Sequence, residues 1–297
     1  MANRDLFECL LEYGCSYFRL RNYAETTRRG YLGDQLLFVR FLKSEYGVSR
    51  VGEVERRHVV DYLTQVERRG VRSATVARKL AALRSFFGYL EEEGSAGSSP
   101  VRGLRRPKQE SAQPRVLSYV EYARLREAAA GDPRGRAIIE VFLQTGIRLS
   151  EAARLRVEDV ALPDGHELPG IGSLRVWGKG RKERTITLNS RACAALIAYL
   201  STRAEYEGNA PLFVSKYGAA LTGRSIERIV AKLTSSTGIA GASVHTLRHT
   251  FATHSVRKGT NVRVVQEALG HSSLQTTSRY VSLARELMDE QLEANAL

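Results

Sequence analysis

The stretch GSAGSSPVRGLRRPKQESAQPRV, from Gly94 to Val116, divides the 297-residue chain into two unequal parts. Ten of its 23 residues are Gly, Ser or Pro, and it holds three of the chain's seven prolines. This composition disfavours helix and sheet and is typical of a flexible linker. We therefore predict an N-terminal domain over residues 1–106, a linker over residues 107–116 and a second domain over residues 117–297.

Upstream of this stretch, apolar residues recur at three- and four-residue spacing, which is the period of an amphipathic helix. The alternating pattern of a half-buried strand is not found there. We therefore predict a small helical bundle, with helices over residues 6–18, 27–46, 54–69 and 73–92.

Downstream of it, the sequence predicts helices together with one β-hairpin. Ser118 and Glu121 form a capping box, and Ser150 is predicted to cap another helix, with Glu151 near its positive end. Between residues 173 and 188, apolar positions alternate on both sides of a Gly-Lys-Gly tip, which is typical of a hairpin. Helices are predicted over residues 118–130, 136–144, 190–207, 222–234, 244–258 and 262–269. The expected fold class is mainly α, with a small antiparallel β-sheet in the second domain.

The charge of the chain indicates a polyanionic partner. The 45 Lys and Arg residues against 32 Asp and Glu give a formal net charge of +13. Residues 1–107 carry +6 and residues 108–297 carry +7, so both domains suit nucleic acid. Arginine supplies 37 of the 45 cations, and its planar fork matches phosphate oxygens, although a GC-rich genome would give the same bias.

The composition argues against several other classes of protein. A hydrophobic content of 43% and a charged content of 26% are ordinary for a globular chain. The longest apolar run is nine residues, against the ~18 needed to span a bilayer, and no charged-then-apolar leader opens the chain. The three cysteines lack metal-ligand spacing and are too few for a disulfide framework. We expect a cytoplasmic protein with no membrane partner.

The histidines gather near the C-terminus. Four of the six lie within 27 residues: His245, His249, His254 and His271. A zinc site is one interpretation, because His245 and His249 are four residues apart on a predicted helix. However, Glu267 is the only carboxylate between His245 and Tyr280, so neither a metalloprotease motif nor a two-metal nuclease site is predicted. We therefore predict no metal site.

Fixed cations can replace metal ions in phosphoryl transfer. Such a site needs a nucleophile, at least two guanidinium groups on the phosphate and a proton donor for the departing oxygen. The sequence offers Tyr280 as the nucleophile, Arg148 and Arg248 as the guanidinium groups and Lys179 at the hairpin tip as the proton donor.

Four motifs in this order make the chain resemble the tyrosine recombinases of the phage-integrase and Xer type. They are TGIRLSE at 145–151, GKGRKER at 178–184, HTLRHTFATH at 245–254, and LGHSS at 269–273 followed by TTSRY at 276–280. The resemblance extends to the first domain and the linker through TTRRGY at 26–31, FFGYL at 86–90 and RRPK at 105–108. It implies a core-binding helical domain and a catalytic domain that close as a C-shaped clamp around duplex DNA.

The resemblance also implies how strands are cut and rejoined. Tyr280 would attack the scissile phosphate, giving a 3′-phosphotyrosyl bond and a free 5′-hydroxyl. Lys179 would protonate the departing 5′-oxygen, and His245 would assist proton transfer at the tyrosine. The 5′-hydroxyl of a partner strand would then attack the phosphotyrosine, so neither ATP nor any other cofactor is expected.

The remaining catalytic residues implied are those that hold the non-bridging phosphate oxygens: Arg148, Arg248 and His271. His249 and His254 lie in the motif, but helix packing is the role expected of them. Glu151 either supports Arg148 or simply complements a helix N-terminus, and the second interpretation is favoured.

Other cations are candidates for DNA contacts. Arg224, Arg228 and Lys232 repeat every fourth residue along one face of a predicted helix. Such a stripe is usually a solvated face, but this helix resembles the DNA-contacting helix of the family and is a candidate for the major groove. The candidates in the first domain are Arg72, Arg78, Lys79 and Arg84. They are expected mostly to meet phosphates.

The expected partners are a double-stranded recombination site and other copies of the chain. The resemblance implies four protomers on two paired sites, exchanging strands through a Holliday junction, and leaves open a second recombinase or an accessory protein. Residues 281–297 form an amphipathic tail through Leu283, Leu287 and Leu292, which could pack on its own domain but is expected to dock on a neighbouring protomer. The setting expected is the nucleoid of a bacterium or archaeon, in an Xer-like or mobile-element role.

Two other functions use some of the same features. A type IB topoisomerase or a telomere-resolving enzyme would share the chemistry without a recombining tetramer. A non-catalytic DNA-binding protein would need only the basic surface, and the complete set of catalytic residue types argues against it.

Overall fold

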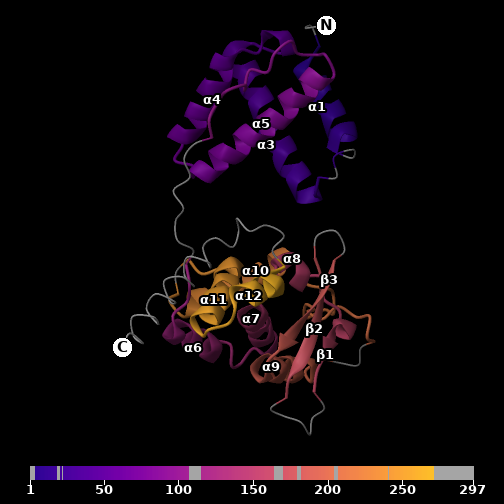
Figure 1. The fold of residues 1–297 in the computed structure, drawn as a ribbon, viewed down its shortest axis with the longest axis vertical. Coiled ribbons are helices and arrows are strands. Elements are labelled where there is room, and N and C mark those ends of the chain that lie inside the picture. Colours follow the sequence, from indigo (N-terminus) through magenta and orange to yellow (C-terminus); the bar gives the residue numbers. More distant parts are fainter. Residues whose placement is uncertain are drawn as a thin grey trace, which may run out of the picture. The chain divides into compact units, whose positions relative to one another are not determined.

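The computed structural model describes residues 4–18, 21, 23–106, 115–163, 170–178, 182–203, 207–239 and 241–270 (Figure 1). Several predicted features lie outside these residues: linker positions 107–114, Lys179, His271, Tyr280 and the tail. The chain divides into two compact units, residues 1–112 and 113–297, and each is described by itself. Within the described ranges, every helix is too short or too polar to cross a bilayer.

The first unit is a helical bundle, as predicted. It comprises α1 (Leu6–Glu12), the π-helical η1 (Tyr13–Tyr17), α3 (Glu25–Tyr46), the 3₁₀ turn η2 (Val51–Glu53), α4 (Arg56–Arg68) and α5 (Ser73–Glu92). Helix α5 packs against both α3 and α4. The core is rich in aromatic rings, including Tyr13, Phe38, Phe86 and Phe87, all at most 1% exposed.

The segment after α5 belongs to this bundle. Val101 is buried in its core, and Leu104 packs against the same cluster. Arg84 donates to the Leu104 carbonyl, and Arg102 pairs with Glu91 at 2.8 Å. Residues 95–104 therefore pack on the bundle, within the residues 1–106 predicted for the first domain, although the Gly, Ser and Pro content of residues 94–116 is typical of a flexible linker. The reason is that Val101 and Leu104 cover a hydrophobic surface.

The second unit is built around a buried central helix. Its helices are α6 (Tyr119–Ala128), α7 (Pro133–Thr145), α8 (Leu149–Ala152), α9 (Ser190–Leu200), α10 (Gly223–Ser236), α11 (Val244–Arg257) and α12 (Val262–Leu269), with the 3₁₀ turn η3 (Val157–Asp159). Helix α7 contacts α9, α10, α11 and the sheet. Its Ile138, Ile139 and Phe142 are fully buried in the main core of the unit, which explains its central place among these elements.

Three antiparallel strands complete this unit in the order β1 (Val160–Ala161), β2 (Gly172–Trp177) and β3 (Glu183–Leu188). The predicted hairpin is confirmed: Leu174 lies opposite Ile186, and the backbone N–H of Gly178 donates to Lys182 at 2.8 Å next to the tip. Strand β1 was not predicted, because a two-residue strand carries no periodicity that a sequence can reveal. The expected fold class is confirmed.

Two helix starts test the capping predictions. The capping box of Ser118 and Glu121 forms as expected at the start of α6. Ser150 does not cap α8; Arg148 occupies that position, and the Glu151 carboxylate accepts its backbone N–H at 2.7 Å. The reason is that the chain turns at Gly146, which adopts the left-handed conformation at the end of α7, so the new helix begins two residues earlier than predicted.

Candidate active site and DNA-facing surface

Arg148 is placed by the turn that links α7 to α8. Gly146 has φ 62°, and a Cβ at this position would lie 2.4 Å from the ring of Phe251 and 2.8 Å from Leu269. Only glycine therefore lets α7 end in contact with α11 and α12. Two residues later, the Arg148 side chain emerges at the start of α8, about one-third exposed.

Arg248 lies on α11 and is almost completely buried, with 8% of its surface exposed. Its guanidinium donates to the Gly146 carbonyl and, at 2.8 Å, to the Leu269 carbonyl. His245 lies one helical turn earlier on α11 and is exposed. The two hydrogen bonds of Arg248 offset the cost of removing its charged guanidinium from water.

The two arginines meet at the C-terminal end of α12. Arg148 donates to the Gly270 carbonyl, next to the Leu269 carbonyl that Arg248 contacts. The exposed carbonyls of a helix C-terminus favour nearby cations. The structure thus brings together Arg148, from the start of α8, and Arg248, from α11, at the residues that immediately precede His271 in the chain, with His245 one turn before Arg248 on α11.

A buried carboxylate beside Arg148 holds a second arginine. Glu151 accepts from the Arg148 Nη1 at 2.9 Å, and from both terminal nitrogens of Arg184 on β3, at 3.0 and 2.9 Å. Burial alone would raise the pKa of the Glu151 carboxyl, but the hydrogen bonds from Arg184 and from the backbone of Arg148 outweigh it and lower that pKa. Glu151 therefore both supports Arg148 and caps α8, so the two interpretations of this residue hold together.

Arg184 is the residue near this site that sequence reasoning missed. The signal was present in the alternation of β3, where Ile186 and Leu188 are buried while Thr185 and Thr187 are exposed. Because side chains alternate between the two faces of a strand, Arg184 lies on the same face of β3 as the buried Ile186 and Leu188. A charged residue at an inward position of a strand needs a buried partner of opposite charge.

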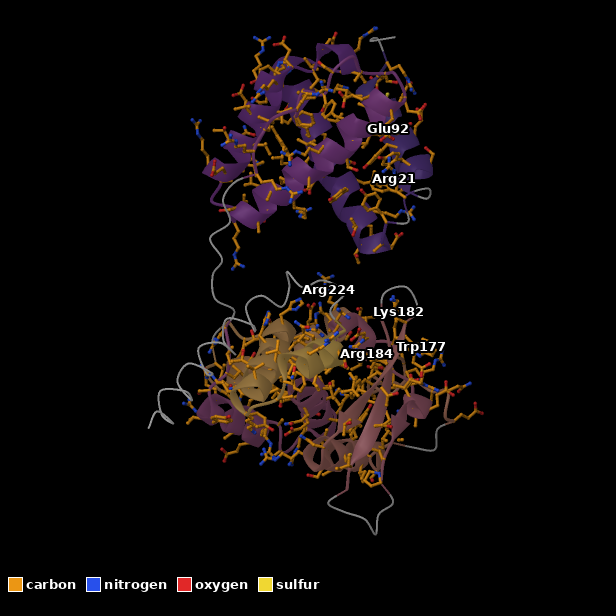
Figure 2. All side chains as sticks on the ribbon, in the orientation of Figure 1. Arg21, Glu92, Trp177, Lys182, Arg184 and Arg224 are labelled. Carbon is orange, nitrogen blue, oxygen red and sulfur yellow. The ribbon has the colours of Figure 1, made fainter. Side chains whose placement is uncertain are left out.

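The basic stripe of α10 faces solvent. Arg224, Arg228 and Lys232 are exposed, whereas the opposite face of the helix is buried through Ile226, Val230 and Leu233. The start of α10 packs on α8, because a Cβ at Gly223 would lie 3.3 Å from Leu149. In the view of Figure 2, Arg224 and Arg184 both lie in the upper half of the second unit, with Arg224 nearer its top.

The four candidate cations of the first unit have different surroundings. Arg72 is exposed, and Arg78 is half-exposed and paired with Asp34. Lys79 is 7% exposed, with its ammonium 2.8 Å from Asp34 and 3.3 Å from the Tyr62 hydroxyl. The Arg84 guanidinium donates to the Leu104 carbonyl. Of these four cations, Lys79 and Arg84 are therefore engaged within the bundle, Arg78 is exposed but paired with Asp34, and Arg72 is exposed.

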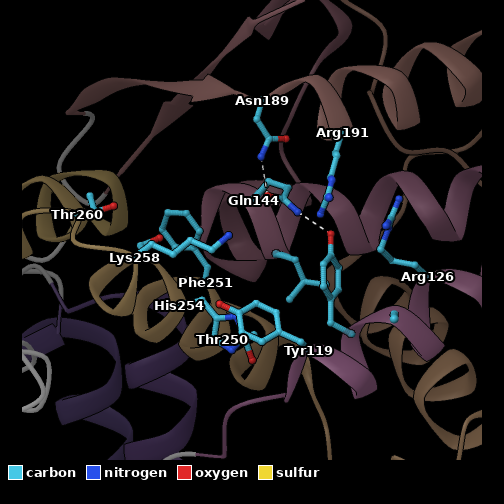
Figure 3. A pocket seen from close by; sticks show the side chains of 14 residues that line it. Tyr119, Arg126, Gln144, Asn189, Arg191, Thr250, Phe251, His254, Lys258 and Thr260 are labelled. Carbon is cyan, nitrogen blue, oxygen red and sulfur yellow. Dashed lines mark hydrogen bonds between the residues drawn. The ribbon is translucent and has the colours of Figure 1, made fainter. Parts of the chain in front are cut away.

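A cavity of about 480 Å³ opens between α6, α7, α9 and α11 (Figure 3). Tyr122 and Arg126, which line it, both donate to the buried Glu140, at 3.0 and 2.6 Å. Arg191 and Lys258 line the exposed rim. The cavity is therefore partly aromatic and carries a basic rim.

His254, which also lines this cavity, is packed rather than free. Its Nε2 lies 3.0 Å from the Leu117 carbonyl, and its ring lies 4.4 Å from that of Tyr119. Burial lowers the pKa of His254. Packing is the role that was expected of it. Among the residues that the structure describes, no group of three His, Cys, Asp or Glu side chains is arranged to hold a metal ion.

Both parts of the chain match known families. Residues 115–286 match the phage integrase family, and residues 12–94 match the phage integrase N-terminal SAM-like domain. The chain is 38% identical over 273 residues to a tyrosine recombinase XerC of Pelobacter propionicus, covering 89% of this chain and 88% of that protein. It is 35% identical over 283 residues to the XerC of Syntrophus aciditrophicus, covering 89% of each.

The fold is similar to that of solved recombinase structures. The XerH site-specific recombinase bound to a palindromic difH substrate superposes with a TM-score of 0.74 at 24% identity, covering 96% of this chain and 87% of that one. A lambda integrase tetramer bound to a Holliday junction gives a TM-score of 0.73 at 18% identity, covering 94% and 77%.

Proposed function

The chain belongs to the phage integrase family, and on this premise we propose that it is a site-specific DNA recombinase acting through a 3′-phosphotyrosyl intermediate and a Holliday junction. The observation that carries the proposal is the meeting of Arg148 and Arg248 at the end of α12, directly before His271. Two guanidinium groups held there are suited to the charge that develops on a phosphate during transfer.

The chemistry conserves the energy of the phosphodiester. The Tyr280 oxygen forms a bond to phosphorus while the bond to the 5′-oxygen breaks, and Lys179 supplies the proton that this oxygen takes up. Arg148, Arg248 and His271 hold the non-bridging oxygens. In the second step the 5′-hydroxyl of a partner strand attacks the same phosphorus and Tyr280 leaves. Neither step needs a metal ion or a nucleotide cofactor.

A covalent adduct formed without metal tests this function. The substrates are nicked duplexes that together cover the DNA around the gene. Cleavage near the nick releases a short fragment with a 5′-hydroxyl, and because this fragment diffuses away, the covalent adduct cannot be reversed. We expect an adduct in EDTA, with the DNA 3′ end attached to the tryptic peptide that contains Tyr280. Tight binding without an adduct on any duplex, or an adduct that EDTA prevents, would contradict the proposal.

The exposed stripe of α10 is the surface we assign to DNA, with Arg72 and Arg78 as contacts of the first unit. Replacing Arg228 with alanine is expected to weaken binding on all sequences and to lower the slope of log affinity against log salt by about 0.9 for one phosphate contact. Replacing the exposed Lys216, which lies outside α10, is the matched control for lost charge. Equal slopes for the two variants would remove α10 from the interface.

We further infer that the protein works as a tetramer on paired sites, and that residues 281–297 of one protomer dock in the α6–α7–α9–α11 cavity of the next. The tail carries four carboxylates and one arginine, which suits the basic rim formed by Arg191 and Lys258. Its leucines suit the aromatic wall.

Reversing one rim charge tests this docking. Lys258→Glu is expected to reduce pairing of two sites by about tenfold, or 1.4 kcal/mol, while single-site binding is unchanged. Lys216→Glu is the control, and native gels with one-site and two-site DNA measure both effects. Normal pairing by Lys258→Glu would contradict docking in this cavity.

The proposal also includes a biological role and a cellular location. The similarity to XerC proteins supports an Xer-like role over a mobile-element one, in the cytoplasm of a bacterium or archaeon where the chromosome lies. We also propose that the two units close as a clamp around duplex DNA. The proposed complex leaves a place for a second recombinase or an accessory protein.

A further inference from the structure

We propose that Arg184 is a positioning residue for catalysis: through Glu151 it preserves the positive charge of Arg148 and fixes the base of the hairpin that carries Lys179. The inference rests on the proposed recombinase function. Arg184 lies on β3, five residues after Lys179, and belongs to none of the catalytic roles described above.

The contacts of Arg184 use its whole guanidinium. Its two terminal nitrogens donate to the two oxygens of Glu151, at 3.0 and 2.9 Å, and its Nε donates to the Ala268 carbonyl at 3.0 Å. The Arg184 side chain is 16% exposed and that of Glu151 only 3%. A bidentate pair of this kind has a fixed geometry, which a surface ion pair lacks.

The charges show what Arg184 adds. Glu151 alone beside Arg148 would form a neutral pair and cancel the charge that Arg148 must present to phosphate. With Arg184 present, two cations share one carboxylate and the group keeps a net charge of +1. Because electrostatic interactions strengthen away from water, this difference acts directly on the phosphoryl-transfer barrier.

A glycine at the end of α12 leaves space for the guanidinium groups of Arg184 and Arg148. Gly270, at the end of α12, has φ 63°, and a Cβ there would lie 2.8 Å from a terminal nitrogen of Arg184 and 3.1 Å from one of Arg148. Only a residue without a side chain lets both guanidinium groups reach α12. Arg184 thus joins β3, α8 and α12: β3 follows Lys179 in the chain, α8 follows Arg148, and α12 precedes His271.

A set of four variants tests the charge argument: Arg184→Met, Arg184→Lys, the double variant Glu151→Gln/Arg184→Met, and Arg175→Met as control. Arg175 is a matched residue on the neighbouring strand, paired with the buried Asp159 at 3.2 Å. Single-turnover cleavage of the nicked duplex, DNA affinity and thermal unfolding are measured for each variant.

We expect Arg184→Met to slow cleavage by about 100-fold, as loss of a transition-state cation does, with DNA affinity within about threefold. Arg175→Met is expected to cleave at the wild-type rate. The decisive result is the double variant: removing the Glu151 charge restores the net charge of +1, so it is expected to cleave about tenfold faster than Arg184→Met. A merely structural role predicts that the double variant is the slower of the two.

The outcomes separate this inference from the proposed function. Absence of an adduct from wild-type protein overturns the function itself. A wild-type adduct together with unimpaired Arg184→Met, or with a double variant slower than Arg184→Met, overturns the role of Arg184. Should Arg184→Met fail to fold, Arg184→Lys decides, because a lysine keeps the charge but cannot bridge both carboxylate oxygens. We expect it to cleave about tenfold more slowly than wild type. The wild-type rate would overturn the positioning role of the bidentate pair, and a loss of about 100-fold or more would overturn the role of the charge.

Discussion

Exchanging Tyr280 for phenylalanine is expected to abolish the covalent protein–DNA adduct while leaving DNA affinity within about threefold of wild type. The substitution removes one oxygen, which in the proposed function forms the bond to phosphorus. Other tyrosines do not replace it, because the attacking group must be positioned against a phosphate that Arg148 and Arg248 already hold. The measurement is a denaturing gel of nicked duplex incubated with each protein in EDTA.

The control for this result is a second tyrosine. Tyr217 is exposed, with 82% of its surface accessible, and lies in a turn before α10. Tyr217→Phe is expected to give the wild-type amount of adduct. An adduct of normal yield from Tyr280→Phe would show that another residue is the nucleophile, even if the recombinase function stands.

Replacing Arg248 with alanine is expected to slow strand cleavage by a factor on the order of 10²–10⁵, the range found for cationic groups on a transferring phosphoryl. Arg148→Ala is expected to fall in the same range. Arg248 also bonds two backbone carbonyls, so its loss is expected to cost about 1–3 kcal/mol of unfolding free energy for each buried acceptor left without a partner. Cleavage and unfolding are therefore measured on the same preparations.

The matched control separates catalysis from stability. Arg203 belongs to the same unit and donates to two backbone carbonyls, those of Pro211 and Leu212, at 2.9 and 3.0 Å. Arg203→Ala is expected to lower stability while folded protein cleaves at the wild-type rate. If Arg248→Ala and Arg203→Ala lose cleavage equally, the effect of Arg248 comes from folding and its place in the active site is wrong.

The local structure of this chain was predictable because it depends on residues close in sequence. Periodic apolar residues predicted the helices of both units, and alternation predicted the hairpin that β2 and β3 form. The capping box of Ser118 and Glu121 involves residues three apart. The error at Ser150 is instructive, because the start of α8 is set by Gly146, whose close contacts come from α11 and α12.

The candidate site was predictable as a set of residue types and only partly as an arrangement. Motifs proposed Arg148, His245 and Arg248, and the fold brings the two arginines together at the end of α12. The sequence did not reveal that Lys79 is buried against Asp34, which lies 45 residues away along the chain. The spacing of a lysine along a helix is the same whether its ammonium group faces water or a distant carboxylate. Nor did it reveal that residues 95–104 cover the core of the bundle.

By itself, then, the sequence determined the fold class, the positions of most helices, the hairpin and the family, because short-range periodicity and ordered motifs encode them. Tertiary structure alone decided that Glu151 is shared by Arg148 and Arg184, which lie 3 and 33 residues from it along the chain. The physical reason is that a buried charge takes its partner from whatever element packing brings within about 3 Å, and that element need not be near in sequence.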